Sequence, residues 1–130
     1  MSASSPTLGL AFVVAAAGGA GAVARALLIH HVGVRRSDPL PVGTMVVNAS
    51  GSIVLGLLTG LALYHGLGPR VLAIAGVGFC GGYTTWSTAS WETVHLVQTG
   101  HRRAAFVYTL GSLVVCLAAA AAGIGLAGLL

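Results

Sequence analysis

Charge is nearly absent from this sequence. Only 6% of its 130 residues are charged, Lys does not occur, and the two acidic residues are Asp38 and Glu92. Soluble domains carry about a quarter of charged residues, whereas this chain is 56% hydrophobic with a mean hydropathy of +0.95. The composition excludes an ordinary soluble domain and indicates an integral membrane protein.

Cysteine and catalytic patterns are also scarce. Cys80 and Cys116 show neither CxxC spacing nor a Cys/His ligand spacing, which argues against a disulfide framework and against a zinc site. No set of nucleophile, base and orienting residue is visible, so we do not expect an enzyme. The histidines lie near expected span ends, where an amphipathic ring is well accommodated: His30, His31, His65, His95 and His101.

Four long apolar segments lie between the polar interruptions, and each meets the roughly 20 residues needed to cross hydrocarbon. They run from about Leu8 to Ile29, Val42 to Leu63, Val71 to Val97 and Ala104 to Leu130. No Lys or Arg precedes Arg25, so we expect the first segment to be a true span and not a cleaved signal peptide. The short linkers leave no room for a soluble domain. The sequence therefore predicts an all-α membrane protein of four transmembrane helices in one domain, residues 1–130.

The arginines indicate sidedness. A net charge of +4 could indicate nucleic-acid binding, but four of the six arginines lie in two short interhelical loops. This placement favours a signal for membrane topology, and we expect no nucleic-acid partner. Arg70 alone shares a side with the two termini, so the positive-inside rule places both termini outside. The opposite side carries Arg35, Arg36, Arg102 and Arg103.

Two polar stripes follow the four-residue period of a helix face. Gly56 and Gly60 have a GxxxG spacing typical of close helix packing, but packing does not explain Asn48, whose amide needs partners in hydrocarbon. The hydroxyls either return to carbonyls one turn back or line a polar path, and two stripes in one small bundle favour the path. The stripes are Thr44, Asn48, Ser52, Gly56 and Gly60 in the second span, and Tyr108, Ser112 and Cys116 in the fourth.

The third segment carries GGYTTWSTAS, residues 81–90, near its middle. Two glycines followed by β-branched threonines weaken a regular helix, so we expect a break there. Carbonyls released between Gly81 and Thr84 would attract a cation, and the amides and hydroxyls that begin the second half would favour an anion. Arg25 either extends to the headgroups or faces a vestibule and supplies positive potential.

Three motifs carry a family resemblance: GAVAR in the first span, GTMVVNASGS in the second and GFCGGYTTWSTASWE in the third. In this order and at these spacings they resemble the Fluc/CrcB fluoride channels over nearly the whole chain. The resemblance implies an antiparallel dimer of dual-topology architecture with two fluoride paths. It also implies one structural sodium ion at the dimer centre, held by backbone carbonyls at positions matching Gly81 and Thr84.

The same resemblance implies a function and a path. Such a channel exports fluoride passively across the bacterial plasma membrane and lowers its cytoplasmic concentration. Arg25 would be the vestibule cation. The fluoride path would use Asn48, Trp86, Ser87, Thr88, Tyr108 and Ser112.

The chain departs from the family at two positions. Where the family motif has two phenylalanines three residues apart, this sequence has Trp86 and Ala89. Paired family members can divide such aromatic positions between two subunits, so we expect a heterodimer with a paralogue in preference to a dual-topology homodimer.

Two other function classes stay open. One is a small four-span multidrug exporter, although the first span lacks the acidic residue that proton coupling needs. The other is a non-transporting membrane assembly subunit.

Overall fold

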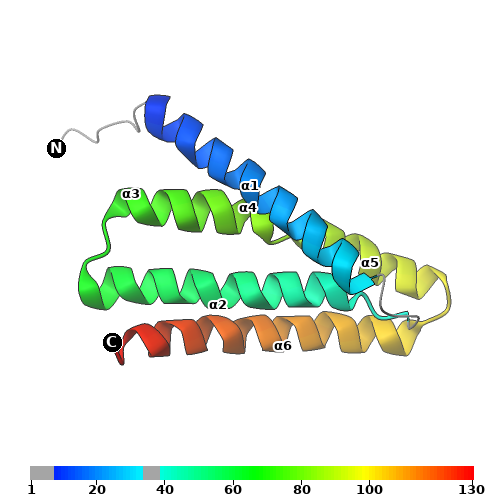
Figure 1. The fold of residues 1–130 in the computed structure, drawn as a ribbon. Coiled ribbons are helices and arrows are strands. Elements are labelled where there is room, and N and C mark those ends of the chain that lie inside the picture. The colour runs from blue at the N-terminus through cyan, green and yellow to red at the C-terminus, as the bar shows by residue number, and fades with distance from the viewer. Residues whose placement is uncertain (1–7, 34–38) are drawn as a thin grey trace.

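The computed structural model describes residues 8–33 and 39–130, and every regular element in these ranges is a helix (Figure 1). The predicted arginine pair Arg35 and Arg36, and also Asp38, lie outside the described residues. The elements in chain order are α1 (Leu8–Gly33), α2 (Val42–His65), α3 (Pro69–Val71), the π-helix η1 (Leu72–Cys80), α4 (Gly81–Tyr83), α5 (Trp86–Gln98) and α6 (Arg102–Ala127).

Three of the four predicted spans are single helices. Within the described residues, α1, α2 and α6 are long and apolar enough to cross a membrane. α1 and α2 begin at the expected residues and end four and two residues later than expected, whereas α6 begins two residues and ends three residues earlier than expected. The third predicted span consists of several pieces. Helical winding runs from Pro69 to Tyr83, and α5 begins at Trp86 after two extended residues.

The two short loops turn through glycine. Gly66 has φ 67° and Gly100 has φ 85°, which are left-handed conformations that favour glycine. Each turn closes with a hydrogen bond back to the preceding helix, from Leu67 N to the Leu61 carbonyl at 3.2 Å and from His101 N to the Leu96 carbonyl at 2.8 Å. These loops set α2 and α6 antiparallel to the pieces of the third span that connect them (Figure 1).

Close contact between α2 and α6 depends on small residues. The two helices lie side by side along their length (Figure 1). A Cβ at Gly56 would collide with the backbone of Ala120, and one at Gly60 would lie 2.6 Å from the Ala127 Cβ. On α6, a Cβ at Gly123 would collide with the backbone of α2 at Ile53. The packing role predicted for Gly56 and Gly60 is therefore confirmed.

A second glycine contact joins α1, which crosses the bundle obliquely, to η1 and α4 (Figure 1). Gly21 touches the Phe79 carbonyl, and Gly82 touches the Gly18 carbonyl. Neither site has room for a Cβ. Backbone contact of this kind brings α1 against the end of the first half of the third span, which places Arg25 near the interruption.

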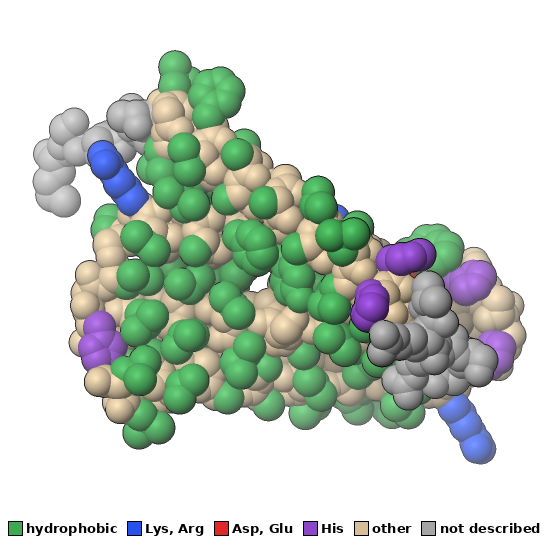
Figure 2. Space-filling model, viewed as in Figure 1, with side chains coloured by type: hydrophobic (Ala, Val, Ile, Leu, Met, Phe, Trp, Pro, Cys, Tyr) green, Lys and Arg blue, Asp and Glu red, His purple; other side chains and the backbone are tan. Residues whose placement is uncertain are grey.

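The surface has the distribution expected of a protein in lipid. Apolar side chains cover the middle of the face in Figure 2, and the histidines lie toward the two ends. Buried large side chains are few, and they include Val47 and Tyr108. Of the three long helices α2 is the most enclosed, with 22% of its apolar window buried against 6% for α1 and 11% for α6. Two polar side chains of α2, Thr44 and Asn48, bond to groups of the third span.

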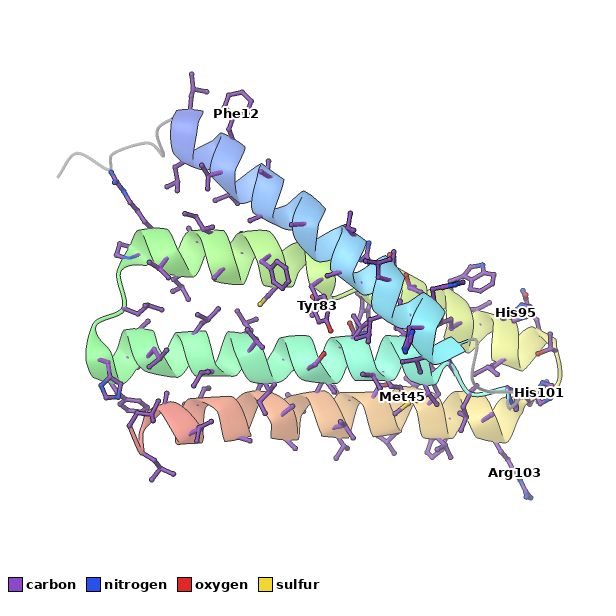
Figure 3. The ribbon with its side chains drawn as sticks, in the orientation of Figure 1. Phe12, Met45, Tyr83, His95, His101 and Arg103 are labelled. Atoms are coloured by element: carbon purple, nitrogen blue, oxygen red, sulfur yellow. The ribbon has the colours of Figure 1, made fainter. Side chains whose placement is uncertain are left out.

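The two ends of the bundle carry different basic residues. The described chain begins and ends at the end that contains Arg70, whereas Arg102 and Arg103 start α6 at the other end, where Arg103 points away from the bundle (Figure 3). The structure therefore places Arg70 on the side of the termini and Arg102 and Arg103 on the opposite side, as the sequence analysis assumed. The orientation in a membrane stays a prediction.

Candidate functional site

The interruption of the third span consists of Thr84 and Thr85, both in extended conformation, with ψ values of 160° and 123°. All four of their backbone polar groups have partners within the chain. Thr84 N donates to the Cys80 carbonyl at 2.9 Å, and the Thr84 carbonyl accepts from Arg25 Nη1 at 3.1 Å. Thr85 N donates to Asn48 Oδ1 at 2.8 Å, and the Thr85 carbonyl accepts from Asn48 Nδ2 at 2.9 Å. The backbone groups of both interrupting residues are therefore paired in an apolar setting.

Thr85 also begins the next helix. Its extended backbone and its hydroxyl, which accepts from Thr88 N at 3.2 Å, make it the N-cap of α5. The two glycines before it, Gly81 and Gly82, remain helical. The conformational change therefore occurs at the threonines, where Asn48 and the cap compensate for lost helical bonds.

Asn48 has partners that the sequence could not identify. Its amide makes two hydrogen bonds to the backbone of Thr85, in the manner of a neighbouring β-strand. This pairing explains an amide on the buried face of α2. Because Nδ2 carries two hydrogens and one is used, a second donor remains on the same group.

A cluster of hydroxyls surrounds the start of α5. Thr85 Oγ1 donates to Thr88 Oγ1 at 2.9 Å and lies 3.3 Å from Ser87 Oγ. Ser87 is exposed and Thr88 is half-buried. The structure thus brings three of the predicted path residues, Asn48, Ser87 and Thr88, together around Thr85, a residue that the sequence reasoning did not assign to the path.

A second polar cluster centres on Glu92, which the sequence reasoning also left out of the path. Thr44 Oγ1 donates to Glu92 Oε1 at 2.9 Å, and the Tyr108 hydroxyl donates to Glu92 Oε2 at 2.7 Å. Both donors are almost completely buried, each with 1% of its surface exposed. The sequence did contain a signal for Glu92. An isolated carboxylate within a membrane span is a candidate functional residue, and Glu92 lies one helical turn after Thr88.

Ser112 differs from the other hydroxyls. Among the buried side-chain nitrogen and oxygen atoms of the described residues, Ser112 Oγ alone has no hydrogen-bond partner. It lies one turn along α6 from Tyr108, as the predicted stripe requires, and Cys116 follows half-buried. A buried hydroxyl without a partner is costly unless a ligand or water meets it.

A cavity of about 210 Å³ leads to the Glu92 cluster from the end of the bundle where α1 stops and α2 starts. Thr44 and Glu92 contribute its polar wall. The apolar part comes from the last turn of α1 and the first residues of α2, among them Ile29, Val32, Pro41 and Val42. The cavity therefore connects one surface of the bundle with buried hydrogen-bonding groups.

The two predicted cation-binding carbonyls have different surroundings. In a continuous helix Thr85 N would return to the Gly81 carbonyl, but it binds Asn48 instead, which releases that carbonyl. Gly81 is exposed, and nothing lies within 4 Å of where its Cβ would be. The Thr84 carbonyl accepts from Arg25 and keeps a second lone pair. Both groups are neutral oxygens, the kind of ligand that a hard cation prefers.

Trp86 and Ala89 have different environments on α5. Trp86 is 83% exposed, whereas Ala89 packs against the buried cluster of Leu96, Ala105 and Tyr108. The large aromatic ring thus lies on the surface of this chain. The position where the family has its second phenylalanine is filled by a methyl group.

These features define a small all-helical membrane protein in which hydrogen-bond donors gather around an interrupted span, with the half-buried Arg25 of α1 beside the interruption. The family model described as CrcB-like protein, Camphor Resistance (CrcB) matches residues 12–124. The chain therefore belongs to the CrcB family.

Curated relatives extend over most of the chain. "Fluoride-specific ion channel FluC 1" of Leifsonia xyli subsp. xyli is 51% identical over 116 residues, which is 89% of this chain and 85% of the relative. "Fluoride-specific ion channel FluC 2" of Cutibacterium acnes is 44% identical over 114 residues, 87% and 93% of the two chains. The relative from Nitrobacter winogradskyi, "Fluoride-specific ion channel FluC", is 39% identical over 112 residues, 85% and 89%.

Proposed function

We propose that this chain is a subunit of a fluoride-specific ion channel in the bacterial plasma membrane, through which fluoride leaves the cell passively. The names of its relatives support fluoride as the conducted ion. They describe an ion channel, which conducts ions and does not catalyse a reaction. The structural observation that carries the proposal is Ser112, whose buried hydroxyl has no partner in the described chain. A donor kept free inside the bundle suits a small anion that must exchange its water shell for protein donors.

The path runs through groups that can donate hydrogen bonds. Ser87 and Thr88 contribute hydroxyls at the start of α5, where the helix dipole also favours an anion. Asn48 contributes its second amide hydrogen and Ser112 its hydroxyl on α6. Tyr108, one turn before Ser112, lines the path, because its own hydroxyl hydrogen is donated to Glu92. The exposed indole of Trp86 offers the positive edge of an aromatic ring. Arg25 supplies positive potential beside the interruption.

The active assembly is an antiparallel dimer with one structural sodium ion at its centre. The exposed, sterically open backbone of Gly81 supports a site shared between two chains, because the opposite carbonyls would come from a partner. Thr84 contributes the other carbonyl. The ion has a structural role and is not transported.

We favour a heterodimer with a paralogous subunit. The outward-facing Trp86 and the small Ala89 support a division of aromatic positions between two different chains. The numbered names FluC 1 and FluC 2 among the relatives are consistent with two genes in some genomes.

The function is tested by fluoride efflux from vesicles that contain this chain, alone and together with its paralogue. Asn48→Leu in the combination that conducts should reduce efflux at least about a hundredfold, because it removes an amide donor and leaves the Thr85 backbone unpaired. Thr59→Ala is the matched control on α2, since among the described residues the Thr59 hydroxyl bonds only to the Leu55 carbonyl of its own helix. Efflux from neither preparation, or equal efflux from N48L and T59A, would contradict the proposal.

A further inference from the structure

Two positively charged groups would interact with the Thr84 carbonyl oxygen. It is one of the oxygens assigned above to the central cation, and it is also the hydrogen-bond partner of the Arg25 guanidinium at 3.1 Å. Arg25 is half-buried in α1, and the contact joins residues 59 positions apart in the chain. A positive side chain thus lies on the same backbone atom that a bound cation would use.

Backbone packing keeps this contact in place. Gly21 in α1 touches the Phe79 carbonyl, and Gly82 touches the Gly18 carbonyl, so the helix that carries Arg25 cannot shift away easily. Asn48 fixes the next residue, Thr85, from the α2 side. The Thr84 carbonyl is therefore held in one position by two neighbouring helices, and the guanidinium cannot be displaced at no cost.

We propose that Arg25 is a positioning residue that weakens the central cation site while it orients the Thr84 carbonyl, and so couples cation binding to the positive potential of the anion path. This inference rests on the cation site of the proposed function. Two positive charges on one oxygen repel each other, and the partly buried setting screens them less than water does. A cation at the second lone pair of the Thr84 carbonyl and the Arg25 hydrogen bond at the first therefore weaken each other.

The coupling gives each ion an effect on the other. When a cation draws on the Thr84 carbonyl, the hydrogen bond from Arg25 Nη1 weakens, and this donor becomes available to an anion beside the other donors of the guanidinium. Conversely, an anion that pairs with Arg25 neutralises it and strengthens the cation site. This reciprocity follows from linkage between two binding equilibria.

The first test measures thermal stability of the detergent-solubilised full-length assembly as sodium replaces choline at constant ionic strength, because a ligand that binds only the folded state raises its stability. We expect Arg25→Gln to lower the sodium concentration of half-maximal stabilisation by about tenfold, since a neutral side chain removes the repulsion. Arg25→Lys keeps the charge and should stay within about threefold of wild type. Arg70→Gln, at the far end of the bundle, is the control for loss of a basic residue and should match wild type.

A second measurement covers the case in which Arg25→Gln does not fold. In wild-type protein labelled with ¹⁵N-arginine, sodium should shift the guanidinium signal of Arg25, identified by its loss in R25K, and leave that of Arg70 unchanged. Unchanged sodium dependence in R25Q, or an Arg25 signal that does not respond to sodium, would overturn the inference. Wild-type stability that is independent of sodium would also overturn it, while fluoride efflux would report separately on the channel function.

Discussion

At the scale of single residues, the site depends on how polar groups inside the bundle find partners. Asn48 pairs with both backbone groups of Thr85, and Glu92 accepts hydroxyls from α2 and α6 at once. Ser112 is the exception among the described buried groups. Function is therefore expected where pairing within the chain is incomplete.

The Glu92 cluster gives a prediction at this scale. Glu92→Ala removes the acceptor for the Thr44 and Tyr108 hydroxyls, which are both buried. Each orphaned hydroxyl costs about 1–3 kcal/mol, so E92A should unfold at a clearly lower temperature in detergent. Thr93→Ala, at the next position, removes a hydroxyl from a surface pair with Thr109 and is the control. An E92A protein as stable as T93A would show that the cluster is hydrated or unimportant.

Tyr83 shows a further residue that pattern reasoning did not find. Its hydroxyl lies 2.8 Å from Ser50 Oγ, and its side chain points from α4 toward α2 (Figure 3). Its ring also stacks on Phe79 with 5.8 Å between centroids. Ser50 already bonds to carbonyls of its own helix, so Tyr83 adds a link between the two helices next to the interruption.

At the scale of helices, glycines decide which backbones can touch. The contact of α1 with η1 and α4 uses Gly21 and Gly82, and the contact of α2 with α6 uses Gly56, Gly60 and Gly123. In lipid there is no hydrophobic gain from pairing helices, so close packing has to supply the association.

Two glycines in α1 test this account. At Gly21 a methyl group would meet the Phe79 carbonyl, whereas at Gly19 nothing lies within 4 Å. Gly21→Ala should destabilise the protein by about 1–3 kcal/mol through overpacking, and its effect on fluoride efflux should follow because α1 carries Arg25. Gly19→Ala should be neutral or stabilising, since alanine favours a helix over glycine by about 1 kcal/mol. Thermal unfolding of the two variants is the measurement, and equal stability would contradict the role assigned to the contact.

At the scale of the whole molecule, the chain exposes much of its apolar surface, which lipid and a partner subunit have to cover. The exposed groups include Trp86 and Trp91 on α5 and Phe12 on α1. A dual-topology dimer would use one such surface twice, whereas a heterodimer would match two different surfaces.

Orientation gives the corresponding prediction. A tag at the C-terminus should be accessible only from outside the cell, because Arg102 and Arg103 lie at the opposite end of the bundle from the C-terminus. This chain alone should give little fluoride efflux, and its paralogue should restore it. Equal labelling from both sides would contradict the arginine argument, and robust efflux from the chain alone would exclude an obligate heterodimer.

Much of the architecture was predictable from local patterns. Apolar length predicted the three long helices, and Gly66 and Gly100 lie in the short linkers expected between spans. The four-residue period of Gly56 and Gly60 predicted close packing. The pairing of Asn48 with Thr85 was not predictable, because it joins positions 37 residues apart on different helices. The same holds for Arg25 and the Thr84 carbonyl.

The sequence by itself determined that this is a helical membrane protein of the CrcB type with polar groups in its second, third and fourth spans, because hydropathy, periodicity and motif spacing are local properties of a chain. Only the tertiary structure decided which groups satisfy one another. Interior hydrogen bonds depend on how helices cross, so it assigned Asn48 to Thr85, Arg25 to the Thr84 carbonyl and Glu92 to its two hydroxyls. It also left Ser112 with a free donor within the described chain.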